Sequence, residues 1–172
     1  MNNDESFKGI KLLVTDVDGV LTSGKVIRAD SGEELRAFNT QDGFGIKILM
    51  GCGIEYAVIS SKKSASTQLR MQQLGLNHIY LGYENKVPAL EDLLQKLNLS
   101  PEQVAYMGDD WPDIAIFNRV GLPIAVANAV LEVKNKAQYV TESTGGKGAV
   151  REVIMRILQA QGLYESLLAQ YQ

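Results

Sequence analysis

The chain has 172 residues, of which 45% are apolar and 22% are charged, and its formal net charge is −3. This length and composition are typical of one packed globular domain over residues 1–172. The mildly acidic balance, without a run of cations, argues against nucleic-acid binding, and no apolar stretch approaches the length of a membrane span.

The compartment is inferred from the cysteine count and the first residues. The chain has one cysteine, Cys52, which cannot form an intrachain disulfide, as is usual in a reducing compartment. The first six residues are polar and acidic, unlike a secretory signal. We therefore expect a cytoplasmic protein.

Short apolar runs alternate with helical patterns along the chain. Strands are predicted at 11–15, 56–59, 79–81, 104–107 and 122–127, and helices at 43–50, 64–74, 87–97 and 149–161. The predicted inner faces include Phe44, Ile48 and Leu49 on the first helix and Leu69 and Leu74 on the second. Such alternation predicts an α/β fold, a three-layer Rossmann-like parallel sheet.

One segment, residues 24–39, interrupts this alternation. It has no helical period, and two extended runs flank Ser31–Gly32, a pair typical of a turn. The segment therefore predicts a β-hairpin inserted after the first strand. It is too short to form a cap domain.

Two carboxylates follow the first predicted strand. Asp16 and Asp18 are two residues apart, so in an extended segment they point to the same side. Parallel sheets bind ligands at the carboxyl ends of their strands. Close carboxylates repel each other unless a cation such as Mg²⁺ lies between them. The pair alone is also compatible with a simple turn, whereas the glycine spacing excludes an EF-hand loop.

Further polar residues follow other predicted strands. Asp109 comes directly after 104–107 and is a candidate metal ligand, with Asp110 and Asp113 as outer ligands. Ser60 follows 56–59 and offers a hydroxyl, and Lys86 precedes a helix and offers a cation. Each of these two would alone be an ordinary surface residue. Together with a divalent metal, these groups can transfer a phosphoryl group to an aspartate.

These residues, in this order, resemble the four motifs of the haloacid dehalogenase superfamily of phosphatases. Asp16 to Thr22 is similar to the first motif, Ser60 to the second, Lys86 to the third and 108–110 to the fourth. Within the superfamily the chain resembles the capless branch that hydrolyses 3-deoxy-D-manno-octulosonate 8-phosphate in lipopolysaccharide synthesis. The hairpin and the segment 145–152 carry this narrower resemblance.

The resemblance implies a role for each motif residue. Asp16 would be the nucleophile and Asp18 the acid/base, and Ser60 and Lys86 would hold the phosphate. Mg²⁺ would be bound by Asp16, by the main-chain carbonyl of Asp18 and by Asp109. The resemblance also implies a homotetramer in which the hairpins form a central barrel and a neighbour closes each active site. The apolar tail, residues 163–172, would pack on its own subunit or reach a neighbour's site.

Substrate recognition is where the chain departs from the family pattern. The family usually continues its second motif as Thr-Gly-Arg, whereas here the run is Ser60-Ser61-Lys62-Lys63. Lys62 keeps the positive charge but not the two-pronged geometry that suits a carboxylate. Asn39 and Asp42 are further candidate substrate contacts. The expected substrate is the eight-carbon ester, with a nine-carbon sialic-acid or deaminated sialic-acid 9-phosphate as the alternative.

A third hypothesis is a non-catalytic scaffold, or a receiver-like module that is phosphorylated and read by a partner. A receiver also carries aspartates at strand ends, but it does not protonate a leaving alkoxide. It therefore needs no second aspartate two residues after the nucleophile. Asp18 favours the enzyme.

Overall fold

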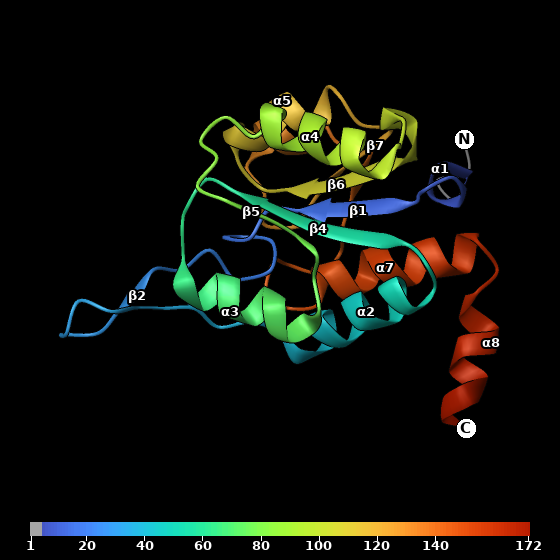
Figure 1. Ribbon diagram of the computed structural model, residues 1–172, viewed down its shortest axis with the longest axis horizontal. Helices are drawn as coiled ribbons and strands as arrows, with labels where there is room; N and C mark the ends of the chain where they lie inside the picture. Colours follow the sequence, from blue (N-terminus) through green and yellow to red (C-terminus); the bar gives the residue numbers. More distant parts are fainter. Residues whose placement is uncertain (1–4) are drawn as a thin grey trace.

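The computed structural model describes residues 5–172 and is built around a parallel sheet (Figure 1). Its six strands are β1 (Leu12–Thr15), β4 (Glu55–Ser60), β5 (His78–Leu81), β6 (Val104–Gly108), β7 (Leu122–Ala125) and β8 (Tyr139–Val140). Their order is β5-β4-β1-β6-β7-β8, and every neighbouring pair is parallel. The five predicted strands are confirmed to within two residues at each end. The two-residue strand β8 is too short to leave a periodic signal.

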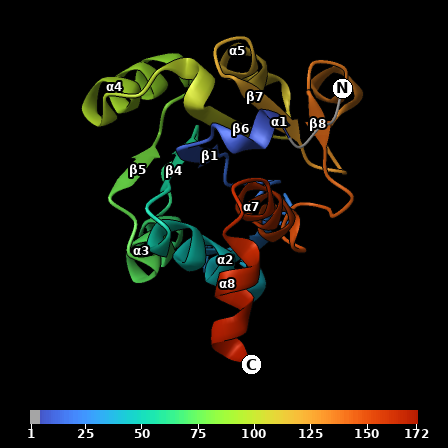
Figure 2. The same cartoon turned by 90° about the vertical axis from the view of Figure 1, so that its right-hand side faces the viewer.

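Helices cover both faces of this sheet. The helices are α1 (Glu5–Lys8), α2 (Thr40–Gly51), α3 (Ala65–Leu74), α4 (Val87–Leu97), α5 (Ile114–Phe117), α6 (Leu131–Lys134), α7 (Ala149–Ala160) and α8 (Tyr164–Leu168), with 3₁₀ turns η1 (Pro101–Gln103), η2 (Trp111–Asp113) and η3 (Ala169–Tyr171). Figures 1 and 2 show α4 and α5 on one face and α2, α3 and α7 on the other. The predicted three-layer α/β architecture is therefore confirmed.

The central strands are buried along their whole length. All four residues of β1 and all five of β6 are buried, as expected for a parallel sheet covered on both faces. In the register, Thr15 of β1 lies beside Met107 of β6 and Val58 of β4. The three strands therefore end at the same edge of the sheet, which is where the polar motifs follow them.

The predicted hairpin is present. Strands β2 (Ile27–Arg28) and β3 (Glu34–Leu35) pair antiparallel around a turn that contains Gly32, at φ 86°. The hairpin projects from the carboxyl edge of the sheet, away from the layers (Figure 1). It exposes Val26, Ile27 and Leu35, and within residues 5–172 no cap domain accompanies it.

Two predicted inner faces are partly wrong. On α2, Leu49 is buried as expected, but Phe44 is 45% exposed, because the buried face also includes Gly43, which packs against α3, and Gly45, which packs against α7. On α3, Leu74 is buried but Leu69 is 57% exposed. Its buried face is instead formed by Thr67, Met71 and Leu74, at spacings of four and three residues. Because threonine is polar, the spacing of apolar residues does not identify Thr67 as part of the buried face.

The C-terminal tail forms α8 and η3 and folds against its own chain. Tyr171 makes an edge-on contact with Phe44, with ring centroids 5.9 Å apart, and the guanidinium of Arg151 of α7 lies 5.4 Å from the centre of the Phe44 ring. The tail therefore contacts its own chain, and its reach into a neighbour's site stays a prediction. In the part of the chain that the structure describes, no helix is long and apolar enough to cross a membrane.

Candidate active site

A polar pocket opens at the carboxyl edge of β1, β4 and β6. Its lining residues come from the loops that follow these strands and from the start of α4 and η2: Asp16, Asp18, Gly24, Ser60, Ser61, Lys62, Lys86, Asp109, Asp110, Pro112 and Asp113. The structure therefore brings together eight of the ten residues singled out from the sequence. A larger share of its lining is charged than in the apolar groove beside α8. This polar pocket is therefore the candidate active site.

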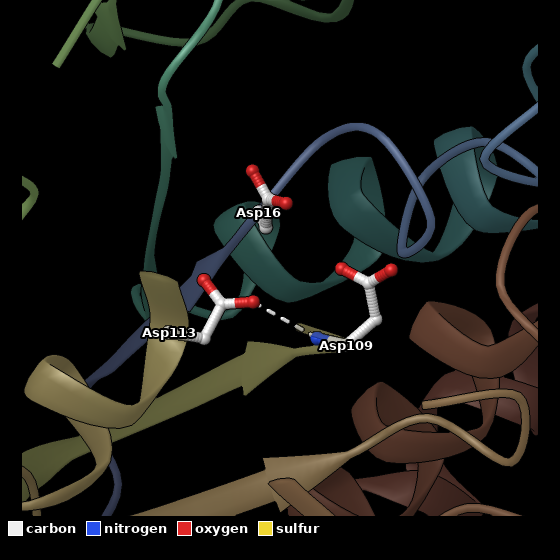
Figure 3. Close-up of side chains that lie close together, drawn as sticks. All are labelled: Asp16, Asp109 and Asp113. Atoms are coloured by element: carbon white, nitrogen blue, oxygen red, sulfur yellow. Dashed lines mark hydrogen bonds between the residues drawn. The ribbon is translucent and has the colours of Figure 1, made fainter. Parts of the chain in front are cut away.

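Three carboxylates meet in the pocket (Figure 3). Asp16 follows β1, Asp109 follows β6, and Asp113 lies in η2; each has an oxygen within 4.8 Å of the other two. The sheet sets this arrangement, because the N–H of Asp16 continues the β1–β6 ladder by donating to the carbonyl of Met107 at 3.0 Å. Asp16 and Asp109 therefore leave neighbouring strands at the same level.

Asp113 is held more firmly than expected of an outer ligand. Its carboxylate is buried and accepts the N–H groups of Asp109 at 2.9 Å and Asp110 at 3.3 Å and the hydroxyl of Tyr106 at 2.7 Å. Asp110 is exposed, and its carboxylate instead caps η2 by accepting the N–H of Trp111 at 2.8 Å. Asp113, not Asp110, therefore lies beside the carboxylates of Asp16 and Asp109.

Lys86 supplies the cation of this cluster. Its side chain is 2% exposed, and its ammonium lies 3.0 Å from Asp16 and 2.7 Å from Asp113. Burial alone would lower the pKa of Lys86, but the two carboxylates outweigh that effect and raise it, so the lysine stays charged. The ammonium therefore links Asp16, which follows β1, to Asp113, whose carboxylate accepts an N–H group at the end of β6.

One lysine does not balance three carboxylates. Burial raises the pKa of Asp16 to about 6 against the opposing pull of Lys86. Burial and the charges of Asp16 and Asp113 raise the pKa of Asp109 to about 8. With all three acids ionised, the cluster carries three negative charges and one positive, a net −2. An all-oxygen donor set with this excess charge fits a hard divalent cation such as Mg²⁺.

Asp18 lines the same pocket but faces a different partner. Both of its oxygens accept from the guanidinium of Arg36, which follows β3 of the hairpin, at 3.0 and 3.2 Å. Its side chain is therefore not one of the three clustered carboxylates. The sequence analysis identified Asp18 but not its contact with Arg36. The alternation of residues in a hairpin does not show which of its side chains points back toward the sheet.

Ser60 and Lys62 lie on the loop that follows β4. Ser60 is buried, and its hydroxyl accepts the N–H of Lys62 at 3.4 Å, while the Lys62 side chain is exposed at the pocket rim. The hydroxyl hydrogen of Ser60 therefore remains available to a ligand in the pocket. Lys62 is in a position to meet the distal part of such a ligand.

Asn39 and Asp42 lie outside this pocket, and their role as substrate contacts stays a prediction. Asn39 is the N-cap of α2, and its side chain accepts the N–H of Gln41 at 2.7 Å. Asp42 is buried and accepts the N–H of Arg151 at 2.8 Å, in the first turn of α7. Because Asp42 is itself an anion at the start of α7, that helix end is not open to another one.

Two glycines that the sequence motifs contain bring the loops close together. Gly19 has φ 96°, and a β-carbon there would overlap the carboxylate of Asp109. Gly145 packs directly on the carbonyl of Gly19, and its N–H donates to Asn128 at 2.6 Å. The segment 145–148 therefore buttresses the loop after β1, and its first amide is used within the protein and does not bind a free anion.

Comparison with known proteins accounts for this combination of sheet and site. Residues 55–154, more than half of the chain, match the family model described as haloacid dehalogenase-like hydrolase. The chain belongs to this family. The resemblance predicted from the four motifs is therefore confirmed, and so is the expected fold.

Close relatives of this hydrolase have names and structures. The 3-deoxy-D-manno-octulosonate 8-phosphate phosphatase KdsC of Escherichia coli K12 is 46% identical over 155 residues, 90% of this chain and 82% of the relative. The crystal structure of such a phosphatase from Yersinia pestis is 42% identical, with a TM-score of 0.94 over 95% of this chain and 89% of that one. A third, from Moraxella catarrhalis in complex with magnesium, phosphate and KDO, is 39% identical, with a TM-score of 0.96 over 99% and 98% of the two chains.

Replacing Lys86 of this hydrolase tests the charge balance of the cluster. We expect Lys86→Met to lower the free energy of unfolding at pH 8, without metal, by about 3 kcal/mol, since it leaves buried carboxylates without their counter-ion. The loss should shrink at pH 5. Without the lysine the folded-state pKa values of the carboxyl groups rise further above their unfolded values, so stability falls as pH rises through that range.

Urea unfolding at pH 5 and pH 8 in the presence of a chelator measures both values. The matched control is Lys96→Met, which removes an exposed lysine from its pair with Asp92, 2.7 Å away, and should behave like the unmodified chain. An equal loss at both pH values would contradict the proposed charge balance.

Proposed function

We propose that this hydrolase is a Mg²⁺-dependent phosphomonoesterase that converts 3-deoxy-D-manno-octulosonate 8-phosphate to the free sugar acid and phosphate. The observation that carries the proposal is the convergence of Asp16, Asp109 and Asp113 with the ammonium of Lys86 at one sheet edge. The relatives named for this activity support the choice of substrate. The single cysteine supports a cytoplasmic location.

The oxygens of Asp16, Asp109 and Asp113 would hold the Mg²⁺, together with the main-chain carbonyl of Asp18. When bound, the ion supplies positive charge beside the transferring phosphoryl oxygens. The Moraxella relative, which carries magnesium and phosphate, supports this assignment. Asp110 would lie outside this ligand set, since its carboxylate caps η2.

The residues of the chain divide the reaction into two steps. An oxygen of Asp16 attacks phosphorus and the bond to the sugar oxygen breaks, while Asp18 gives its proton to that oxygen, which leaves as the alcohol. Asp18 then takes a proton from water, whose oxygen attacks the aspartyl phosphate and releases phosphate and free Asp16. Lys86 and the hydroxyl of Ser60 hold the phosphoryl oxygens in both steps.

Replacing the nucleophile tests this mechanism. Asp16→Asn keeps the size of the side chain but removes its nucleophilic charge, so we expect the rate of phosphate release to fall by at least about 10³-fold. Phosphate release with excess Mg²⁺ measures it, and circular dichroism verifies that the variant is folded. Asp92→Asn, a change at an exposed carboxylate on α4, is the matched control and should keep full activity. An Asp16→Asn variant with normal turnover would exclude the aspartyl-phosphate mechanism.

Lys62 is the reason to keep the nine-carbon acid phosphate as a second candidate substrate. A lysine at the pocket rim offers a carboxylate a single charged donor, whereas the arginine usual in the family offers a fork of two. We expect kcat/KM to be higher for the eight-carbon than for the nine-carbon ester, and Lys62→Arg to change kcat/KM without changing kcat by more than about threefold.

Side-by-side kinetics of the two esters with both proteins measure this preference. A clear preference of the unmodified enzyme for the nine-carbon ester would overturn the first choice of substrate. Failure to release phosphate from any member of a panel of esters would instead favour the non-catalytic scaffold.

We also propose that the protein assembles into a homotetramer through its hairpins. The support is that Val26, Ile27 and Leu35 expose apolar side chains on a segment that projects from the sheet. The same segment is too small to cover the pocket, so a neighbouring subunit would exclude water from it.

Dilution tests the tetramer. We expect a mass of four chains by light scattering, and Val26→Glu together with Leu35→Glu to give monomers with at least about tenfold lower kcat/KM for the sugar-acid ester. The matched control, Leu69→Glu, changes an exposed leucine on α3 and should leave the mass unchanged. A dilute monomer with full activity would refute closure by a neighbour.

A further inference from the structure

Arg36 links the hairpin to the pocket. Although it lies directly after β3, on the projecting hairpin, its side chain is only 6% exposed. We propose that Arg36 is a positioning residue, which holds the carboxylate of Asp18 in the orientation required for proton transfer to and from the substrate oxygen. This inference rests on the proposed function and assigns the hairpin a part in the reaction itself.

The first support is the geometry of the pair. The Nε of Arg36 donates to Oδ1 of Asp18 at 3.0 Å, and Nη2 donates to Oδ2 at 3.2 Å. Two parallel bonds to a planar carboxylate fix both its position and the tilt of its plane, which one bond to a lysine cannot do. Among the residues from 5 to 172, no other side chain has a hydrogen bond to this carboxylate.

The second support is that the guanidinium is itself fixed. Its Nη1 donates to the hydroxyl of Ser64 at 2.9 Å, and its Nη2 lies 2.9 Å from a carboxylate oxygen of Glu34. Ser64 is the N-cap of α3, where it also accepts the N–H of Thr67 at 3.2 Å. Every nitrogen of the guanidinium therefore has a partner, and Arg36 cannot rotate without breaking the cap contact or the ion pair.

The third support is the exposure of the two partners. The side chain of Asp18 is 28% exposed at the pocket, whereas that of Arg36 is 6% exposed behind it. The arginine therefore braces the carboxylate from the protein side and leaves its other side toward the pocket. The fork also matches the ionised carboxylate, the form in which Asp18 takes a proton from water in the second step.

This role predicts a dependence on the leaving group. An alkoxide is a poor leaving group and needs the proton of Asp18, whereas p-nitrophenolate leaves readily without one. Misplacing Asp18 should therefore slow the first step, cleavage of the ester bond, for an alkyl ester and spare it for an aryl ester. The second step, in which Asp18 takes a proton from water, is common to both esters, so the comparison is made on the first step. General disruption of the pocket would slow the first step of both esters alike.

The experiment compares Arg36→Met and Arg36→Lys with the unmodified enzyme, using 3-deoxy-D-manno-octulosonate 8-phosphate and p-nitrophenyl phosphate. For Arg36→Met we expect the single-turnover rate of ester cleavage to fall about 30-fold or more on the sugar ester with KM within about threefold, and the single-turnover rate of p-nitrophenolate release to change less than about threefold. Arg36→Lys should recover part of the loss. The matched control is Arg28→Met, which removes the other hairpin arginine near Glu34, exposed and 3.9 Å from it.

The outcomes separate the two proposals. If the unmodified enzyme releases phosphate from neither ester, the proposed function falls and the role of Arg36 falls with it. If it cleaves both esters but Arg36→Met slows the single-turnover cleavage of both equally, or of neither, the proposed function stands and the positioning role is overturned. Light scattering on each variant verifies that its assembly is the same as that of the unmodified enzyme.

Discussion

The structure of the site depends on one buried interaction, the ammonium of Lys86 between Asp16 and Asp113. Without a cation there, carboxylates from the ends of β1 and β6 could not share a space that water barely reaches, because each would be forced toward its protonated form. The lysine compensates only part of the charge. The remaining negative charge of the three carboxylates would favour the binding of a divalent cation at the cluster.

The sheet and the glycines make this interaction possible. Parallel pairing ends β1 and β6 at one level, and η2 turns Asp113 back under the N–H of Asp109. Gly19 lets the loop after β1 pass the carboxylate of Asp109, and Gly145 closes against the outer side of that loop. A side chain at either glycine would push the loop out and separate the charges that Lys86 joins. The fold therefore brings the three carboxylates and the ammonium of Lys86 close together, and their charges determine what the site can bind.

Much of this could be predicted from the sequence, because strands buried on both faces leave continuous apolar runs and the motif residues follow them directly. The sequence did not identify the residues whose role depends on the direction in which the side chain points. Leu69 looks like a core residue but points outward, since Thr67 and Met71 form the inner face of α3. Tyr106 lies in a correctly predicted strand, yet nothing in its neighbours shows that its hydroxyl reaches Asp113. Contacts between segments far apart in sequence leave no local pattern, and Arg36 with Asp18 is of this kind.

The hairpin connects the proposed assembly of the protein to its proposed chemistry. Some enzymes exclude water with a lid of their own, whereas within residues 5–172 the pocket has beside it only the two short antiparallel strands of the hairpin. One side of that segment exposes apolar residues suited to a neighbouring subunit, and its base carries Arg36, whose bonds reach both Asp18 and the cap of α3. Packing of neighbours against the hairpin would therefore also restrain the arginine. In the proposed tetramer, the contact that closes the pocket and the contact that orients the acid/base would lie on the same short hairpin, so assembly would also restrain the geometry of proton transfer.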